Sequence, residues 1–181
     1  MSIRQKMKKV PFINKTYKTY VKHTRLTSKY KIFGNIKNSE NLVVVLAGYK
    51  AFLWDEVFYR LNKFLPQDNK FEVCIVSSGV YSDELKRIAE KYNWVYMSVK
   101  RNNVCLAQNT AINAFPAAKY IYKIDEDMFL TKGFFEELKN TYLQVNEKTH
   151  YTCGFVAPLI PINGVGHVEI LKKYNKIKDF E

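Results

Sequence analysis

The stretch YIYKIDED, residues 120–127, runs from a short apolar segment directly into three consecutive carboxylates. Its first five residues are mostly aromatic or β-branched, which is typical of a buried strand. The carboxylates then fall where that strand ends. In extended backbone Asp125 and Asp127 point to the same side, and two hard oxygen ligands there suit Mg²⁺ or Mn²⁺. The stretch therefore predicts a strand that ends in a metal site, and the plain alternative is a solvated acidic turn.

Apolar strands and amphipathic helices alternate before this stretch. The predicted strands are residues 42–46, 71–76 and 94–99. The predicted helices are residues 53–64, 82–92 (capped by Ser82) and 106–114. Further on we expect a helix capped by Thr131, a strand at 151–156 and a helix at 167–174. This alternation predicts an α/β domain with a largely parallel sheet.

Three of the predicted strands end in small or polar residues: Gly48, then Ser77-Ser78-Gly79, then residues 125–127. The carboxyl ends of parallel strands share one edge of the sheet, and ligands bind outside that edge. We therefore expect the three loops to converge, with small residues admitting a nucleotide and the carboxylates holding a metal on its diphosphate. The glycine patterns of a dinucleotide fingerprint and of a P-loop do not occur, which disfavours both.

Positive charge is concentrated near the start of the chain. Residues 1–40 hold eleven Lys or Arg and one acidic residue, whereas residues 41–181 hold eighteen Lys or Arg and sixteen acidic residues. We therefore expect a basic N-terminal extension, residues 1–40, in front of a domain that comprises residues 41–181. Basic residues interleaved with tyrosines suit an anionic membrane surface, and less well single-stranded nucleic acid. A solvated arm is the plain alternative.

The three cysteines, Cys74, Cys105 and Cys153, have no metal-ligand spacing and lie in apolar surroundings. They are typical of reduced core cysteines in a cytoplasmic protein. The basic N-terminus lacks the apolar block of a secretory signal, and no apolar run approaches the ~20 residues of a membrane span. We expect a cytoplasmic protein, peripheral at the inner face of the membrane if the extension docks there.

The pattern resembles the nucleotide-binding half of GT-A glycosyltransferases, especially family-2-like enzymes. The likeness lies in Ala47-Gly48-Tyr49 after the first strand, in RNNVCLAQNTAI at residues 101–112, and in the Asp-x-Asp strand at residues 120–130. It covers roughly residues 41–160. The resemblance implies a Rossmann-like single domain with a mostly parallel central sheet. It also implies a nucleotide-diphospho-sugar donor, often UDP-linked, Mn²⁺ or Mg²⁺ on the diphosphate, and a glycan or lipid-linked acceptor.

Carried over by position, the resemblance makes Asp127 the metal ligand and turns Asp125 toward the ribose or sugar and the metal. Glu126 is expected to turn away or to tune its neighbours, and to matter less than either aspartate. The other residues expected around the donor are Ala47, Gly48, Tyr49, Ser77, Ser78, Arg101, Gln108 and Asn109. Ser77-Ser78 stand where the family commonly has an aspartate, and Gln108 replaces its usual arginine, so the nucleotide stays open.

An inverting transfer needs a carboxylate that takes the proton of the acceptor hydroxyl. The family places this base well downstream of the metal motif, where Glu169, beside His167, is the candidate; the plain reading of this pair is the start of a surface helix. Little chain follows Asp127 from which to build an acceptor wall. We therefore expect this chain to bind the donor but to transfer sugar slowly unless a partner or a longer form completes it.

Three other functions are weighed against this one. A haloacid-dehalogenase-like phosphatase also uses two aspartates two residues apart, but it would have Thr or Val at the position of Phe129 and its motif normally opens the domain. A nucleotidyltransferase of similar topology would have a glycine-rich basic loop after the first strand, where only Gly48 and Lys50 are present. The third is a nucleotide-sugar-binding protein or subunit without catalysis.

Overall fold

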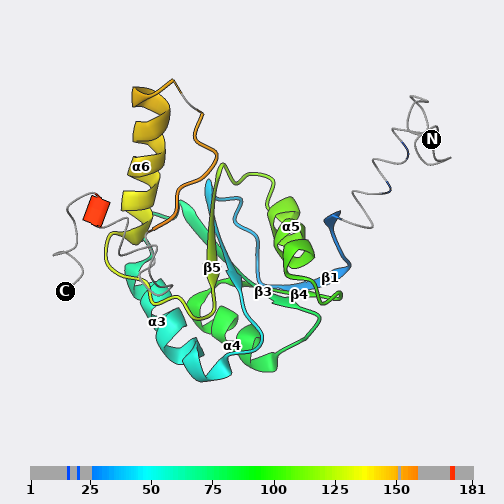
Figure 1. The fold of residues 1–181 in the computed structure, drawn as a ribbon. Coiled ribbons are helices and arrows are strands. Elements are labelled where there is room, and N and C mark those ends of the chain that lie inside the picture. Colours follow the sequence, from blue (N-terminus) through cyan, green and yellow to red (C-terminus); the bar gives the residue numbers. More distant parts are fainter. Residues whose placement is uncertain (1–15, 17–19, 21–25, 151, 159–171, 174–181) are drawn as a thin grey trace. The chain divides into compact units, whose positions relative to one another are not determined.

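The computed structural model, drawn in Figure 1, describes residues 16, 20, 26–150, 152–158 and 172–173. The chain divides into two compact units, Met1–Lys132 and Gly133–Glu181. The first unit contains the sheet and every residue of the cavity described below.

The sheet has five strands in the order β1-β4-β3-β2-β5. Their bounds are Tyr30–Phe33 (β1), Asn41–Leu46 (β2), Phe71–Ser78 (β3), Val95–Val99 (β4) and Tyr120–Asp125 (β5). Neighbouring strands run parallel, except that β1 pairs antiparallel with β4. The predicted α/β class and mostly parallel sheet are confirmed, and the arrangement is compatible with a Rossmann-like fold.

Helices cover both faces of this sheet (Figure 1). They are α3 (Trp54–Phe64, after a 3-10 turn at Ala51–Leu53), α4 (Asp83–Tyr92) and α5 (Val104–Ala114). Alternate residues of β2, such as Val44 and Leu46, share a core cluster with Ala107 and Ala111 of α5. Helices α3 and α4 lie on the other side of the sheet. Because β2 is covered on both faces, all six of its residues are buried, which explains its unbroken apolar run.

Helix caps agree with the sequence in α4 and α5. The Ser82 side chain accepts a hydrogen bond from the backbone N–H of Leu85 at 3.2 Å, as predicted. Helix α5 begins two residues earlier than predicted, at Val104. The Asn103 side chain accepts from the N–H of Leu106 at 3.0 Å and so caps this helix.

Three local predictions differ from the structure. Strand β1 lies inside the predicted basic extension; the sequence gives little sign of it because this short edge strand is mostly exposed. The strand predicted at 151–156 is wrong, since described residues 152–158 form no strand and Phe155 is 84% exposed. Thr131 is not a cap, because α6 (Phe134–Lys148) begins after Gly133, whose carbonyl accepts the first helical hydrogen bond. Of residues 167–174 only Lys172 and Lys173 are described, and both are helical.

The cysteines occupy different environments, so the prediction of core cysteines holds for one of them. Cys74 on β3 is buried, Cys105 is exposed and Cys153 is intermediate, and all three are free thiols. Burial raises the pKa of the Cys74 thiol, which keeps it protonated and inert. Along the described parts of the chain, none of the helices combines the length and the apolar character needed to cross a membrane.

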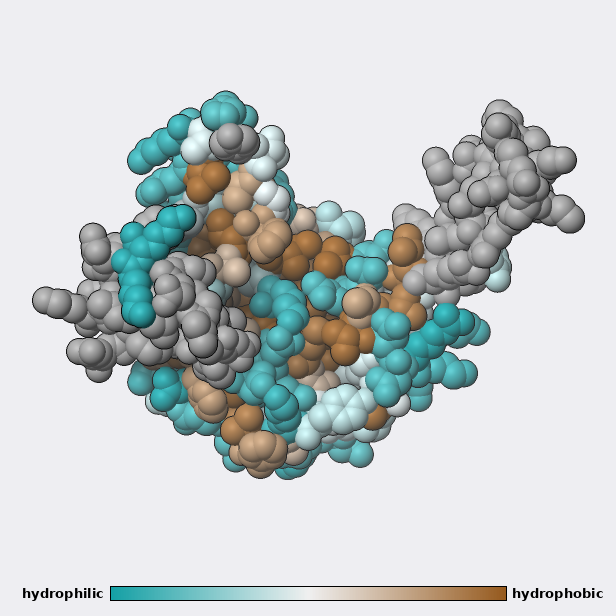
Figure 2. Space-filling view, viewed as in Figure 1, coloured by the Kyte–Doolittle hydropathy of each residue, from teal (hydrophilic) through white to brown (hydrophobic). Residues whose placement is uncertain are grey.

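Apolar residues also reach the surface, as the brown areas among hydrophilic ones in Figure 2 show. Among the described large hydrophobic residues the highest exposed fractions belong to Phe155 (84%), Phe52 (82%) and Tyr49 (62%). Tyr49 and Phe52 flank Lys50 in the segment that follows β2. Exposed aromatic surface therefore gathers beside the carboxyl end of β2.

Candidate functional site

The carboxyl ends of β5, β2 and β3 lie side by side, because Leu46 at the end of β2 pairs with Asp125 on one side and Val76 on the other. The chain goes from β2 to β3 and β4 on one side and returns to β5 on the other, which makes this edge a topological switch point. A cavity of about 280 Å³ opens there. It is lined by Leu46, Ala47, Tyr49, Lys50, Val76, Ser78, Val104, Asp125, Glu126 and Asp127. The predicted convergence of three loops is confirmed.

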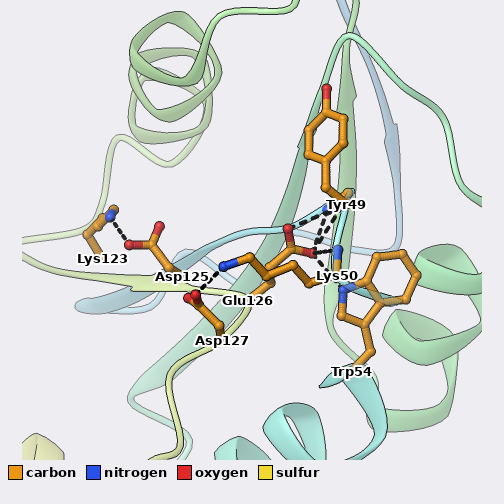
Figure 3. A network of polar contacts seen from close by, with 8 residues as sticks. Tyr49, Lys50, Trp54, Lys123, Asp125, Glu126 and Asp127 are labelled. Carbon is orange, nitrogen blue, oxygen red and sulfur yellow. Dashed lines mark hydrogen bonds and ion pairs between the residues drawn. The ribbon is translucent and has the colours of Figure 1, made fainter. Parts of the chain in front are cut away.

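The carboxylate of Glu126 holds the loop after β2 (Figure 3). The backbone N–H groups of Gly48 and Lys50 donate to Oε2 at 2.9 and 3.1 Å. The N–H of Tyr49 lies 3.1 and 3.2 Å from the two carboxylate oxygens. The indole Nε1 of Trp54 donates to Oε2 at 2.7 Å. Three successive backbone N–H groups and one indole N–H thus donate to the single carboxylate of Glu126.

This position differs from the expectation that Glu126 turns away. The N–H of Met128 donates to the carbonyl of Asp125 at 3.1 Å, so the chain turns directly after β5 and the alternation of an extended strand stops there. Glu126 is only 7% exposed and points beneath the loop. Because both of its oxygens already accept hydrogen bonds from the protein, Glu126 shapes the wall of the cavity.

Asp125 and Asp127 lie on the same turn, and each carboxylate has its own lysine (Figure 3). Lys50 forms an ion pair with Asp127, and Lys123 forms one with Asp125. The two aspartate side chains are 45% and 39% exposed, for Asp125 and Asp127 respectively. The hydrogen bond from Lys50 lowers the pKa of the Asp127 carboxyl, and the same contact raises the pKa of Lys50. Both aspartates line the cavity with exposed carboxyl groups.

Asp125 and Asp127 offer two exposed carboxylates on one turn, next to the cavity. Within the described residues, no group of three or more His, Cys, Asp or Glu side chains is arranged to hold a metal ion. Mg²⁺ and its analogues bind through one or two carboxylates together with water and substrate phosphates. The donor set of Asp125 and Asp127 matches that mode and does not amount to a cage built by the protein alone.

The two serines at the end of β3 have separate positions. Ser78 lines the cavity, and its hydroxyl accepts from the N–H of Asn103 at 2.8 Å and donates to the carbonyl of Arg101 at 3.2 Å. Ser77 is fully buried and bonds to the hydroxyl of Tyr96 at 2.8 Å. Successive residues of a strand face opposite sides of the sheet, so one of the pair has to point away. Ser77 is therefore not among the residues that line the cavity.

Tyr49, in the loop after β2, contacts the end of β3 and the loop after β4. Its hydroxyl donates to the carbonyl of Ser78 at 3.1 Å and lies 3.3 Å from Oδ1 of Asn102. Gly79, directly after β3, permits the close approach of Asn102 from the loop after β4. A Cβ at Gly79 would lie 2.4 Å from the Cβ of Asn102, and the φ of Gly79 is +76°. The ring of Tyr49 is thereby held at the cavity while most of it stays exposed.

Several residues expected around the donor are not among those that line the cavity. They are Gly48, Arg101, Gln108 and Asn109, and the segment of the last three contributes Val104 to the lining. Glu169 lies outside the described residues. Lys50 as a member of the site and Trp54 as a partner of Glu126 were not predicted. The position of Lys50, two residues after Gly48 in the loop, could have indicated it.

No protein-family model matches the chain, and neither does any curated protein sequence. The case for a function therefore rests on the cavity: two accessible carboxylates, a lysine, a backbone loop held rigid by Glu126, and an exposed aromatic ring.

Proposed function

We propose that the chain is a GT-A-like glycosyltransferase. Its cavity would bind a nucleotide-diphospho-sugar, with UDP-linked sugars as the first candidates, and the sugar would go to a glycan or lipid-linked acceptor. The observation that carries this proposal is the meeting of the β2 loop, Ser78 and the pair Asp125 and Asp127 around one cavity at the switch point of the sheet. A nucleotide needs such a combination, since its base and ribose pack on a loop while its diphosphate needs cations.

In this proposal different residues of the cavity bind different parts of the donor. Asp125 and Asp127 would hold a divalent cation, which when bound stabilises the charge that grows on a departing diphosphate. Tyr49 offers its exposed ring to the base or ribose. The cavity of about 280 Å³ is slightly smaller than most ligand pockets, roughly 300–1,000 Å³. It therefore suits the diphosphate and ribose, with the sugar outside it.

Calorimetric titration of UDP-, GDP- and CDP-sugars, with and without Mn²⁺, tests donor binding. We expect one nucleotide to bind in a strictly Mn²⁺-dependent way. Release of nucleoside diphosphate in the presence of acceptors would identify a transferase. Formation of pyrophosphate from a nucleoside triphosphate and a sugar phosphate would identify a nucleotidyltransferase, and binding without turnover a non-catalytic protein. The absence of Mn²⁺-dependent binding for all three nucleotides would contradict the proposal.

We also propose that the basic residues before β1 attract the protein to anionic membranes. Residues 1–26 hold eight Lys or Arg, and each near a membrane surface adds about 1 kcal/mol before screening. The N–H of Ser28 donates to Thr110 at 3.0 Å, and Lys29 accepts from Lys100 at 2.9 Å, so a shortened chain has to keep residues from 27 onward.

Co-sedimentation with phosphatidylserine-containing vesicles measures this attraction. We expect the full chain to sediment with these anionic vesicles at low salt and to be released as the salt concentration rises. It should not sediment with neutral vesicles. A chain that begins at Thr27 keeps β1 and serves as the matched control. If this shortened chain sedimented as well as the full one, the attraction would not come from residues 1–26.

A further inference from the structure

The backbone and the side chain of Lys50 are held in different ways. Its N–H is fixed to the buried carboxylate of Glu126 at 3.1 Å, together with the N–H groups of the two preceding residues. Its side chain is 45% exposed and reaches Asp127 across the cavity. A lysine has a flexible four-carbon stem and a point charge at its tip. The charge of Lys50 can therefore move within the cavity while the loop stays in place.

The charges around the turn make this movement favourable when a ligand arrives. Asp125, Glu126 and Asp127 place three carboxylates on successive residues, and Lys50 supplies the cation for the last of them. A divalent cation on Asp127 would take over that carboxylate and repel the ammonium group. A diphosphate brought by the same cation offers the ammonium a new anionic partner in the same cavity.

Lys123 is not placed to exchange an aspartate for a ligand in the cavity. It pairs with Asp125, two residues away on the same strand, and it does not line the cavity. Its side chain is about as exposed as that of Lys50, at 41% against 45%. Lys123, a lysine of similar exposure in an ion pair with the neighbouring aspartate, is therefore a matched control for UDP binding at saturating Mn²⁺.

We propose that Lys50 exchanges partners: in the empty site it competes with the divalent cation for Asp127, and in the loaded site it binds the diphosphate of the donor. This inference rests on the proposed function and adds a diphosphate-binding residue to it. Its consequence is that Lys50 weakens the binding of metal alone and strengthens the binding of nucleotide with metal.

Lys50→Gln separates the two effects, since glutamine keeps the backbone N–H and the polar surface but removes the charge. Binding of Mn²⁺ alone is measured by electron paramagnetic resonance of the free ion. We expect it to become about 2- to 5-fold tighter, the range for loss of an exposed ion pair. Binding of UDP at saturating Mn²⁺ is measured by calorimetry. We expect it to weaken about tenfold or more, as for loss of a hydrogen bond between charged groups. Lys123→Gln should change UDP binding by less than about 2-fold.

The outcomes distinguish this inference from the proposal beneath it. If the parent binds Mn²⁺ and UDP but Lys50→Gln leaves both affinities unchanged, the partner exchange is wrong and the donor site stands. If Lys50→Gln weakens Mn²⁺ binding, the competition for Asp127 is wrong. If the parent binds neither Mn²⁺ nor UDP, both the donor site and the exchange are wrong. Circular dichroism and thermal unfolding of the variants establish that each is folded before binding is measured.

Discussion

Replacing Glu126 with alanine is expected to lower the free energy of unfolding by about 3 kcal/mol or more, the range for breaking a buried, hydrogen-bonded charged group. The substitution removes the acceptor of three backbone N–H groups, those of Gly48, Tyr49 and Lys50, and of the indole of Trp54. Glu126 is 7% exposed, so water does not readily replace the lost acceptor. Denaturation in urea, followed by circular dichroism, measures the change.

Two variants calibrate this result. Glu126→Gln keeps one oxygen acceptor but turns an amide N–H₂ toward the donors of the loop, so its stability should lie between those of the parent and of Glu126→Ala. Glu56→Ala removes an exposed glutamate that pairs with Arg60 on the same helix, and it should cost less than about 0.5 kcal/mol. If Glu126→Ala were as stable as Glu56→Ala, the loop after β2 would not depend on this carboxylate.

Strands β2, β3 and β4 were predictable because nearly all of their residues are buried. Each residue of β2 is covered, and such a strand shows as a continuous apolar run whatever surrounds it. Strand β1 was not predictable in this way, because its residues are mostly exposed and its position depends on pairing with β4. The prediction of a strand at 151–156 was wrong because it relied on apolar residues such as Phe155 alone. Apolar residues form a strand only when another strand pairs with them.

The loops that meet at the site could be predicted from the sequence, but the directions of their side chains could not. The meeting of the loops follows from parallel topology alone, so Gly48, Ser78 and Asp125 could be brought together from the sequence. The inward position of Glu126 depends on a turn after β5 that a strand-like reading does not contain. The ion pair of Lys50 with Asp127 joins residues 77 positions apart, and a long side chain chooses such a partner only once the fold has formed.

Replacing Asp127 with alanine is expected to weaken Mn²⁺-dependent binding of UDP by about 100-fold while the protein stays folded. Substituting a residue that only hydrogen-bonds to a metal ligand lowers metal affinity roughly 10- to 100-fold. Loss of the ligand itself should therefore lower the affinity by about 100-fold. The Asp127 side chain is 39% exposed and pairs with an equally accessible lysine, so its removal should cost less than about 1 kcal/mol of stability. Calorimetry of UDP with Mn²⁺ and urea denaturation measure the two quantities.

Asp68→Ala is the matched control, because Asp68 is an exposed aspartate paired with Lys70 at 3.9 Å and lies outside the cavity. Its UDP affinity should equal that of the parent, and Asp125→Ala should fall between the two. Unchanged affinity in Asp127→Ala would exclude Asp127 as a metal ligand. For Mn²⁺ alone, Asp127→Ala should bind more weakly than the parent and Lys50→Gln more tightly. If the ion pair served only stability, substituting Asp127 and substituting Lys50 would not change Mn²⁺ affinity in opposite directions. The comparison of the two variants therefore tests whether Asp127 and Lys50 belong to a binding site.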